Sequence, residues 1–156
     1  IHKLLEQCRS LLSAEAGGII DFERDYDPSL PETEGNAEQL YQAILNITKN
    51  ALEALTEANI PSARVRFSTR AVRRAHPGSR GSHQMLQVRI EDNGPGIPED
   101  LKDRIFFPMV SGRAQGSGIG LSITQTIISR HHGWIEVNSK PGRTAVDVIL
   151  PFGDIQ

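Results

Sequence analysis

The chain has 156 residues, of which 38% are hydrophobic and 23% charged, and its formal net charge is −2. This length and apolar content suit one globular domain and argue against a disordered tail. The nearly balanced charge removes a whole-domain electrostatic case for nucleic-acid binding, and the single cysteine, Cys8, excludes an internal disulfide framework. The sequence contains no apolar run of the roughly 18 residues that span a membrane and no signal peptide, so we expect a cytoplasmic domain that makes no membrane contact itself. Because the sequence does not begin with Met, we expect a fragment of a longer protein, and a membrane anchor elsewhere in that protein stays open.

The first half of the chain predicts two helices and three strands. Apolar residues at helical spacing predict a helix over residues 1–16, which a glycine pair ends. A short strand follows over 19–24. Asn36 is placed to cap a long helix that runs to about residue 57, with Gln39 in the capping-box position. Alternating apolar and polar residues predict strands over 65–71 and 86–91, joined by a loop at 75–82.

The second half predicts a turn, two helices and a hairpin. Residues 93–98 form a glycine- and proline-rich turn, and Pro98 suits the first position of a short helix. Residues 110–118 are poor in apolar side chains and predict a mobile loop. A helix over 119–132 ends at Gly133. The strands 134–139 and 143–150 are expected to pair around a type II turn at Pro141 and Gly142.

Two asparagines stand four residues apart on one side of the long helix. Asn is a poor helix former, because its side chain competes for backbone hydrogen bonds. The pair Asn46 and Asn50 therefore indicates a role other than helix formation. An amide oxygen is a good neutral ligand for Mg²⁺, which nucleotide sites hold with few protein ligands plus phosphates. A solvated polar face is the alternative.

Asp92 falls in phase with the apolar residues of the strand before it. A carboxylate on the core side needs a hydrogen-bond donor, and an adenine amino group at the bottom of a pocket would supply one. Gly94 and Gly96 would let the backbone approach a flat ligand closely. An ordinary Asp-Asn-Gly turn is the alternative.

Two further features point to a nucleotide. The run Gly-Ser-Gly-Ile-Gly-Leu at 116–121 opens a helix, where exposed amide groups at the positive end of the dipole favour phosphate. It lacks the Gly-Lys-Ser/Thr ending of a Walker motif, and a flexible linker is the alternative. Thr144 lies on the inner side of the last strand, where its hydroxyl needs a partner, although neighbouring backbone could provide it.

In this order, the motifs resemble those of the catalytic domain of histidine kinases, within the wider group that includes gyrase, Hsp90 and the MutL ATPases. Residues 46–50 resemble the N box, 92–97 the G1 box, 106–108 the F box, 116–121 the G2 box and 142–144 the closing strand. The resemblance implies a Bergerat fold, an α/β two-layer sandwich in which a mixed sheet of about five strands packs on three helices. It also implies that residues 17–156 form the ATP-binding domain and that residues 1–16 end a linking or dimerisation helix.

The resemblance assigns roles to these residues. Asn50 would hold Mg²⁺ bridged to the triphosphate of ATP, and Asp92 would accept from the adenine amino group, helped by a water bonded to Thr144. The amides around Gly118 and Gly120 would meet phosphate, and residues 107–116 would form the ATP lid. The predicted nucleotide-binding residues are Asn46, Asn50, Asp92, Gly94, Gly96, Ile97, Phe107, Gly116, Ser117, Gly118, Ile119, Gly120, Leu121 and Thr144.

Two positions depart from relatives of this group. Clamp ATPases carry a glutamate, the base that activates water, four residues before the metal-binding asparagine. Here that position is Asn46, which cannot take up a proton, and phosphoryl transfer is favoured over hydrolysis. Many histidine kinases carry a lysine where this chain has Glu53. Lys49 and Arg113 are the candidates for the missing phosphate contact in catalysis beside Asn50, although each could equally be a solvated charge.

The phosphate acceptor is expected on another domain. None of the five histidines is followed by the acidic residue and proline of the family's H box. The motifs look most like those of the nitrogen-regulation subgroup, which implies a response regulator acting through the full-length kinase and a PII-type signalling protein near the lid. Two alternatives remain open: a clamp-type ATPase that hydrolyses ATP rapidly without a partner, and a non-catalytic nucleotide-binding module.

Overall fold

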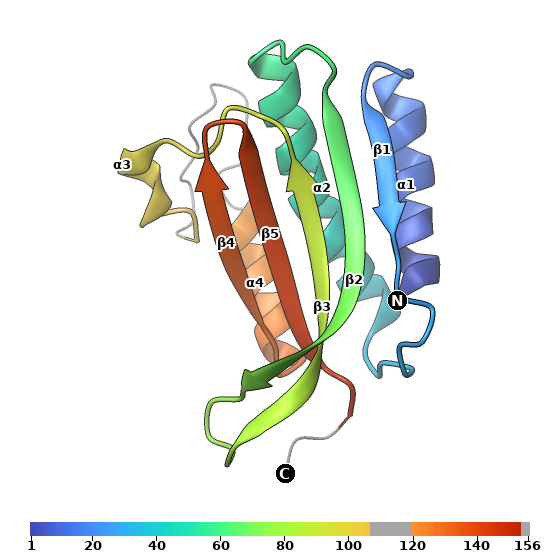
Figure 1. Cartoon of the computed structure of the whole chain (residues 1–156), viewed down its shortest axis with the longest axis vertical. Coiled ribbons are helices and arrows are strands. Elements are labelled where there is room, and N and C mark those ends of the chain that lie inside the picture. Colours follow the sequence, from blue (N-terminus) through green and yellow to red (C-terminus); the bar gives the residue numbers. More distant parts are fainter. Residues whose placement is uncertain (107–119, 154–156) are drawn as a thin grey trace.

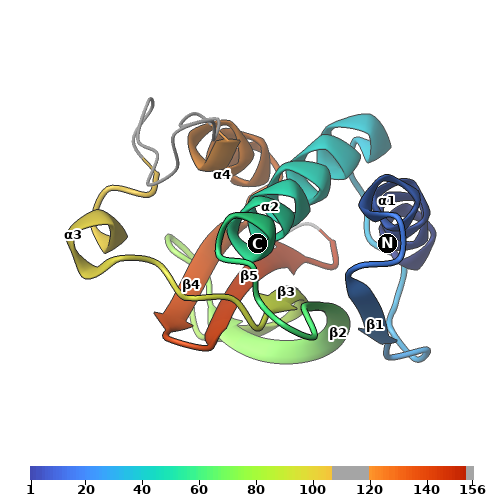
Figure 2. The same ribbon diagram turned by 90° about the horizontal axis from the view of Figure 1, so that it is seen from above.

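One mixed sheet and the helices on one of its faces make up the computed structural model, which describes residues 1–106 and 120–153. Along the chain the elements are α1 (His2–Ala16), β1 (Asp21–Asp25), α2 (Ala37–Glu57), β2 (Arg64–Ala75), β3 (Ser82–Asp92), α3 (Glu99–Lys102), α4 (Gly120–Arg130), β4 (Trp134–Lys140) and β5 (Arg143–Pro151). The strand order is β1-β2-β3-β5-β4, with β1 parallel to β2 and the other neighbours antiparallel. Helices α1, α2 and α4 cover one face, and the predicted two-layer sandwich is confirmed (Figures 1 and 2).

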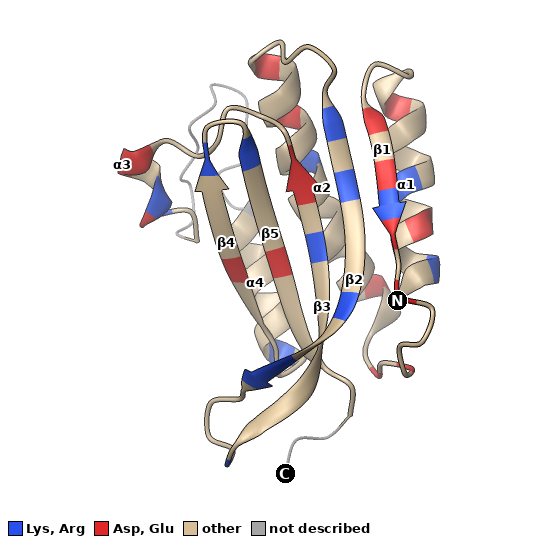
Figure 3. Cartoon of the chain, viewed as in Figure 1, with Lys and Arg blue, Asp and Glu red and all other residues tan. Residues whose placement is uncertain are grey.

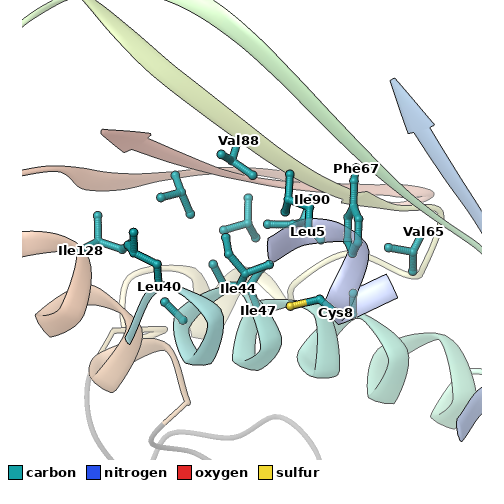
Figure 4. Close-up of a cluster of buried hydrophobic side chains, with 14 of the residues drawn as sticks. Leu5, Cys8, Leu40, Ile44, Ile47, Val65, Phe67, Val88, Ile90 and Ile128 are labelled. Atoms are coloured by element: carbon teal, nitrogen blue, oxygen red, sulfur yellow. The ribbon is translucent and has the colours of Figure 1, made fainter. Parts of the chain in front are cut away.

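The core lies between α2 and the inner face of the sheet (Figure 4). Ile44 and Ile47 of α2 are each 2% exposed and face Phe67 and Val88 of the central strands, which are fully buried. Helix α1 belongs to the same core, because its Cys8 side chain is fully buried and packs with these residues. Burial raises the pKa of the Cys8 thiol to about 12. The thiol therefore stays protonated and serves as a packing group.

The start of α2 is tied to the end of α4. Asn36 Oδ1 accepts from the backbone N–H of Gln39 at 2.9 Å, as the sequence predicts. The other half of the predicted capping box is wrong, because the N–H of Asn36 donates to His131 Nε2 at 3.0 Å rather than to Gln39. Because Nε2 accepts this bond, the hydrogen bonds place the ring proton on Nδ1, which donates to the carbonyl oxygen of Ile127 at 2.8 Å. One histidine thus joins the two helices.

Several predicted boundaries shift: β1 covers Asp21–Asp25 rather than 19–24, and α4 ends at Arg130 rather than at residue 132. The hairpin of β2 and β3 pairs as far as Ala75 and Ser82, beyond the apolar alternation, because backbone pairing continues where Ala71 is already exposed. Its far end bends across the sheet, and the His76 ring lies 6.0 Å from the Trp134 ring (Figure 1). Pro98 caps α3 and does not occupy its first turn. The predicted loop at 110–118 lies outside the described residues.

The outer face of the sheet carries paired charges (Figure 3). Asp25 of β1 binds Arg66 and Arg70 of β2. Asp147 of β5, 7% exposed, accepts two hydrogen bonds from Arg89 of β3, and this carboxylate raises the pKa of Arg89. Such pairs satisfy the polar groups of this face. Within the described ranges, no helix is both long and apolar enough to cross a membrane.

Gly133, which ends the turn after α4, leaves no room for a side chain. Its N–H donates to the carbonyl of Ile128 at 3.0 Å, and an added Cβ would lie 2.1 Å from the carbonyl oxygen of Ile149. Because that oxygen belongs to the sheet, Gly133→Ala is expected to lower the free energy of unfolding by about 3 kcal/mol. Chemical denaturation would measure the change, with Gly153→Ala as control, since a Cβ there meets nothing within 4 Å. Equal stability of the two variants would contradict the packing described.

Candidate functional site

A cavity of about 600 Å³ opens between the second half of α2, the end of β3, the β4–β5 turn and residues 95–105. Its volume is in the range of sites that enclose a small organic ligand. Six of the residues predicted to bind nucleotide line it: Asn50, Asp92, Gly96, Ile97, Leu121 and Thr144. These come from four separate parts of the chain, and the fold brings them to one place.

The polar floor of the cavity is formed where β3 and β5 pair. Asp92 is the last residue of β3 and lies opposite Thr144 of β5 in the sheet register. Both side chains are buried on the inner face, at 7% and 9% exposure. Asp92 Oδ1 accepts from the backbone N–H of Gly94 at 2.9 Å, which stabilises the carboxylate and fixes its rotamer. A buried carboxylate flanked by a hydroxyl suits a ligand that offers a hydrogen-bond donor.

The segment after Asp92 is held against the β4–β5 turn. The N–H of Gly142 donates to the carbonyl of Gly94 at 3.0 Å, and the N–H of Ile97 donates to Ser139 Oγ at 2.8 Å. Gly96 has a φ of 86°, and a Cβ there would lie 2.7 Å from the carbonyl oxygen of Lys140. Glycine is therefore required at Gly96 for both its backbone conformation and its close contact. The turn predicted at residues 93–98 therefore forms a rigid wall of the cavity.

The remaining predicted residues lie elsewhere. Lys49 is exposed on α2, Asn46 is half-buried one turn before Asn50, and Gly94 is buried beside Asp92, but none of the three lines the cavity. Gly120 is the first residue of α4. Outside the described residues are Phe107, Arg113, Gly116, Ser117, Gly118 and Ile119.

Comparison with known proteins settles the family. Residues 35–154 match the family of histidine kinase-, DNA gyrase B- and HSP90-like ATPases. The chain belongs to this ATPase family. The resemblance seen in the motifs is thereby confirmed, and ATP use follows from membership.

Relatives of this ATPase domain are sensor kinases. The chain is 44% identical over 152 residues to the sensory histidine kinase/phosphatase NtrB of Vibrio alginolyticus, covering 97% of this chain and 43% of that protein. It is 44% identical over 151 residues to NtrB of Rhodobacter capsulatus, covering 97% and 42%. The chain thus spans less than half the length of the curated relatives it matches.

Solved structures show the same fold. The catalytic domain of the histidine kinase ThkA aligns with a TM-score of 0.79 at 24% identity, covering 97% of this chain and 92% of that one. The mycobacterial sensor histidine kinase MprB aligns with a TM-score of 0.75 at 24% identity, covering 96% and 94%. The ATPase domain therefore has the architecture of histidine kinase catalytic domains.

Sequence reasoning missed part of the ATPase cavity. Ala51 and Ala54 line it from α2, and Ala58, which caps the end of that helix, continues the row at helical spacing. This row of small residues in the sequence indicates space beside the helix. Lys102 of α3 also lines it and donates to the backbone carbonyl of Ser139 at 3.0 Å. Ser139 lies in phase with Ile135 and Val137, so a hydroxyl on the inner side of β4 was visible in the pattern.

The side chains that line the cavity suit Mg²⁺ only when the metal ion is bound together with a nucleotide. Within residues 1–106 and 120–153, no group of three or more His, Cys, Asp or Glu side chains could hold a metal ion. The cavity offers the amide of Asn50 instead. One neutral amide ligand suits Mg²⁺ that takes most of its oxygens from phosphates and water.

Proposed function

We propose that this domain binds Mg²⁺-ATP and passes the γ-phosphoryl group to a histidine on a separate dimerisation domain, as part of an NtrB-like sensor kinase in nitrogen regulation. The observation that carries the proposal is the buried Asp92, set beside Thr144 at the floor of a cavity in an ATPase-family domain. Similarity to NtrB proteins over 97% of the chain supports the kinase assignment.

The cavity would orient ATP by its base. Asp92 would accept from the adenine amino group, with Thr144 acting beside it through a water molecule. Ala51 and Ile97 would contact the flat faces of the base, because both line the same cavity as Asp92 and Thr144. The apolar walls would exclude water, which strengthens the hydrogen bond to the carboxylate.

Asn50, which lines the cavity, would hold Mg²⁺ through its amide oxygen. The metal ion would neutralise charge on the phosphates during transfer. Lys49 stands next to Asn50 on α2 and Arg113 lies outside the described residues; both remain proposed phosphate contacts, as do the amides of residues 116–120. Phosphoryl transfer depends mainly on this positioning and charge neutralisation, so the domain needs no base of its own.

Asn46 supports transfer rather than hydrolysis. It lies one turn before Asn50, where a glutamate could activate water, but an amide cannot take up a proton. The chain alone, given Mg²⁺-ATP, is expected to bind the nucleotide and release phosphate only slowly. Calorimetry and a phosphate-release assay test this together. Rapid turnover without a partner would instead support a clamp-type ATPase, and an absence of ATP binding would end the proposal.

The further partners belong to the whole kinase. We propose a response regulator as the downstream partner and a PII-type signalling protein as a regulator near residues 107–116, both in the cytoplasm. A structure of the fold relative ThkA contains the response regulator protein TrrA. We also propose that residues 1–16 connect the domain to its dimerisation helix, and the packing of α1 into the core would make this connection rigid.

A further inference from the structure

Ser139 connects three parts of the cavity wall. It lies near the end of β4, and its Oγ accepts from the backbone N–H of Ile97 at 2.8 Å. The same Oγ is 2.8 Å from Thr144 Oγ1 on β5. Its backbone oxygen accepts from Lys102 of α3 at 3.0 Å. The residue therefore touches the base-binding segment, the floor and the short helix at once.

Either hydroxyl of the Ser139–Thr144 pair can donate to the other, and the acceptors around the pair decide the direction. A serine hydroxyl has one proton to donate, and the N–H of Ile97 already occupies one of its acceptor positions. In the described part of the chain, Thr144 Oγ1 is the one acceptor within hydrogen-bond distance of Ser139 Oγ. Once a ligand presents an acceptor to Thr144, donation by Ser139 gives both hydroxyl protons an acceptor, whereas donation by Thr144 would leave the Ser139 proton without one. A ligand that presents an acceptor to Thr144 therefore favours Ser139 as the donor of the pair.

This direction determines what Thr144 can offer. When its oxygen accepts from Ser139, its own proton is available to a ligand in the cavity that the side chain lines. Asp92, directly opposite in the register, presents an acceptor. The floor then offers an acceptor and a donor side by side. Adenine presents the complementary edge, an amino donor beside the ring nitrogen N1, whereas guanine presents a carbonyl beside an N1–H.

We infer that Ser139 is a positioning residue that orients the Thr144 hydroxyl as a donor, through the bridging water molecule, toward N1 of the base and thereby gives the site its preference for adenine. The inference rests on the proposed binding of ATP in this cavity. It assigns Ser139 a role in base selection, through Thr144, beyond its support of the wall at Ile97.

The test compares ATP with 1-deaza-ATP, which keeps the amino group but lacks the N1 acceptor. Calorimetric affinities would be measured for the unchanged chain, Ser139→Ala, Ser139→Thr and the exposed neighbour Asn138→Ala. Ser139→Ala removes the hydroxyl that orients Thr144, and we expect it to reduce the preference for ATP over 1-deaza-ATP about tenfold. Ser139→Thr should restore the preference, and Asn138→Ala should leave it unchanged.

A purely structural role gives a different result. If Ser139 only supports the wall at Ile97, Ser139→Ala weakens both nucleotides equally and the preference is unchanged, which overturns the inference. Should Ser139→Ala fail to fold, Thr144→Val must remove the same preference, and its retention overturns the inference too. Failure of the unchanged chain to bind ATP would instead overturn the proposed function.

Discussion

Asp92→Asn is expected to weaken ATP binding about 100-fold while the domain stays folded. A hydrogen bond to a charged group contributes up to about 3 kcal/mol, and removing the charge forfeits most of it. The orientation of the new amide side chain lowers the affinity for ATP further. Asp92 Oδ1 accepts from the N–H of Gly94, so the new amide keeps its oxygen there and turns its NH₂ group toward the adenine amino group. Two donors would then face each other. Calorimetric titration with ATP measures the effect.

Asp147→Asn is a matched control for this variant. Asp147 is as buried as Asp92, at 7% exposure, but it lies on the outer face of β5 and pairs with Arg89. Its substitution should lower the free energy of unfolding by about 1–3 kcal/mol without changing ATP affinity. If Asp92→Asn bound ATP with unchanged affinity, Asp92 would not be part of the site.

Asn50→Ala is expected to remove the dependence of the site on Mg²⁺. In the presence of the metal, ATP affinity should fall about tenfold, and phosphoryl transfer should fall about 100-fold, because the charge on the phosphates is no longer neutralised in place. With the metal chelated, the variant and the unchanged chain should bind ATP equally, since the contacts to the base are intact.

Gln42→Ala serves as the control for Asn50→Ala, because Gln42 is an exposed polar residue of the same helix. It should change neither affinity nor transfer. If Asn50→Ala transfers phosphate at the unchanged rate, other groups hold the metal. If neither Asn50→Ala nor removal of the metal changes transfer, a non-catalytic nucleotide-binding module is supported.

Much of the architecture was predictable because it follows from local patterns. The phase of Asp92 with the apolar residues of β3 placed its carboxylate on the inner face, and the structure confirms this burial. The cap at Asn36, the α2 helix and the β4–β5 hairpin are likewise set by neighbouring residues. These features depend on short-range periodicity and turn chemistry, which a sequence displays directly.

Contacts between distant segments were not predictable in this way. The partner of the Asn36 N–H is His131, which lies 95 residues along the chain. The contacts of Ser139 with Ile97 and Lys102 likewise need the tertiary placement of β4 beside the segment after β3. Local sequence patterns identify the polar residues that stand at buried or helical positions. The tertiary structure is needed to show which of these residues contact one another.

Transfer of labelled γ-phosphate tests the proposal most directly. The chain would be mixed with Mg²⁺-ATP and a separate dimerisation domain that carries the H box of an NtrB relative. We predict acid-labile label on the histidine of that domain, which depends on Mg²⁺ and disappears with Asp92→Asn. ATP binding without any label on histidine, or label released only as free phosphate, would contradict the assignment as a kinase domain.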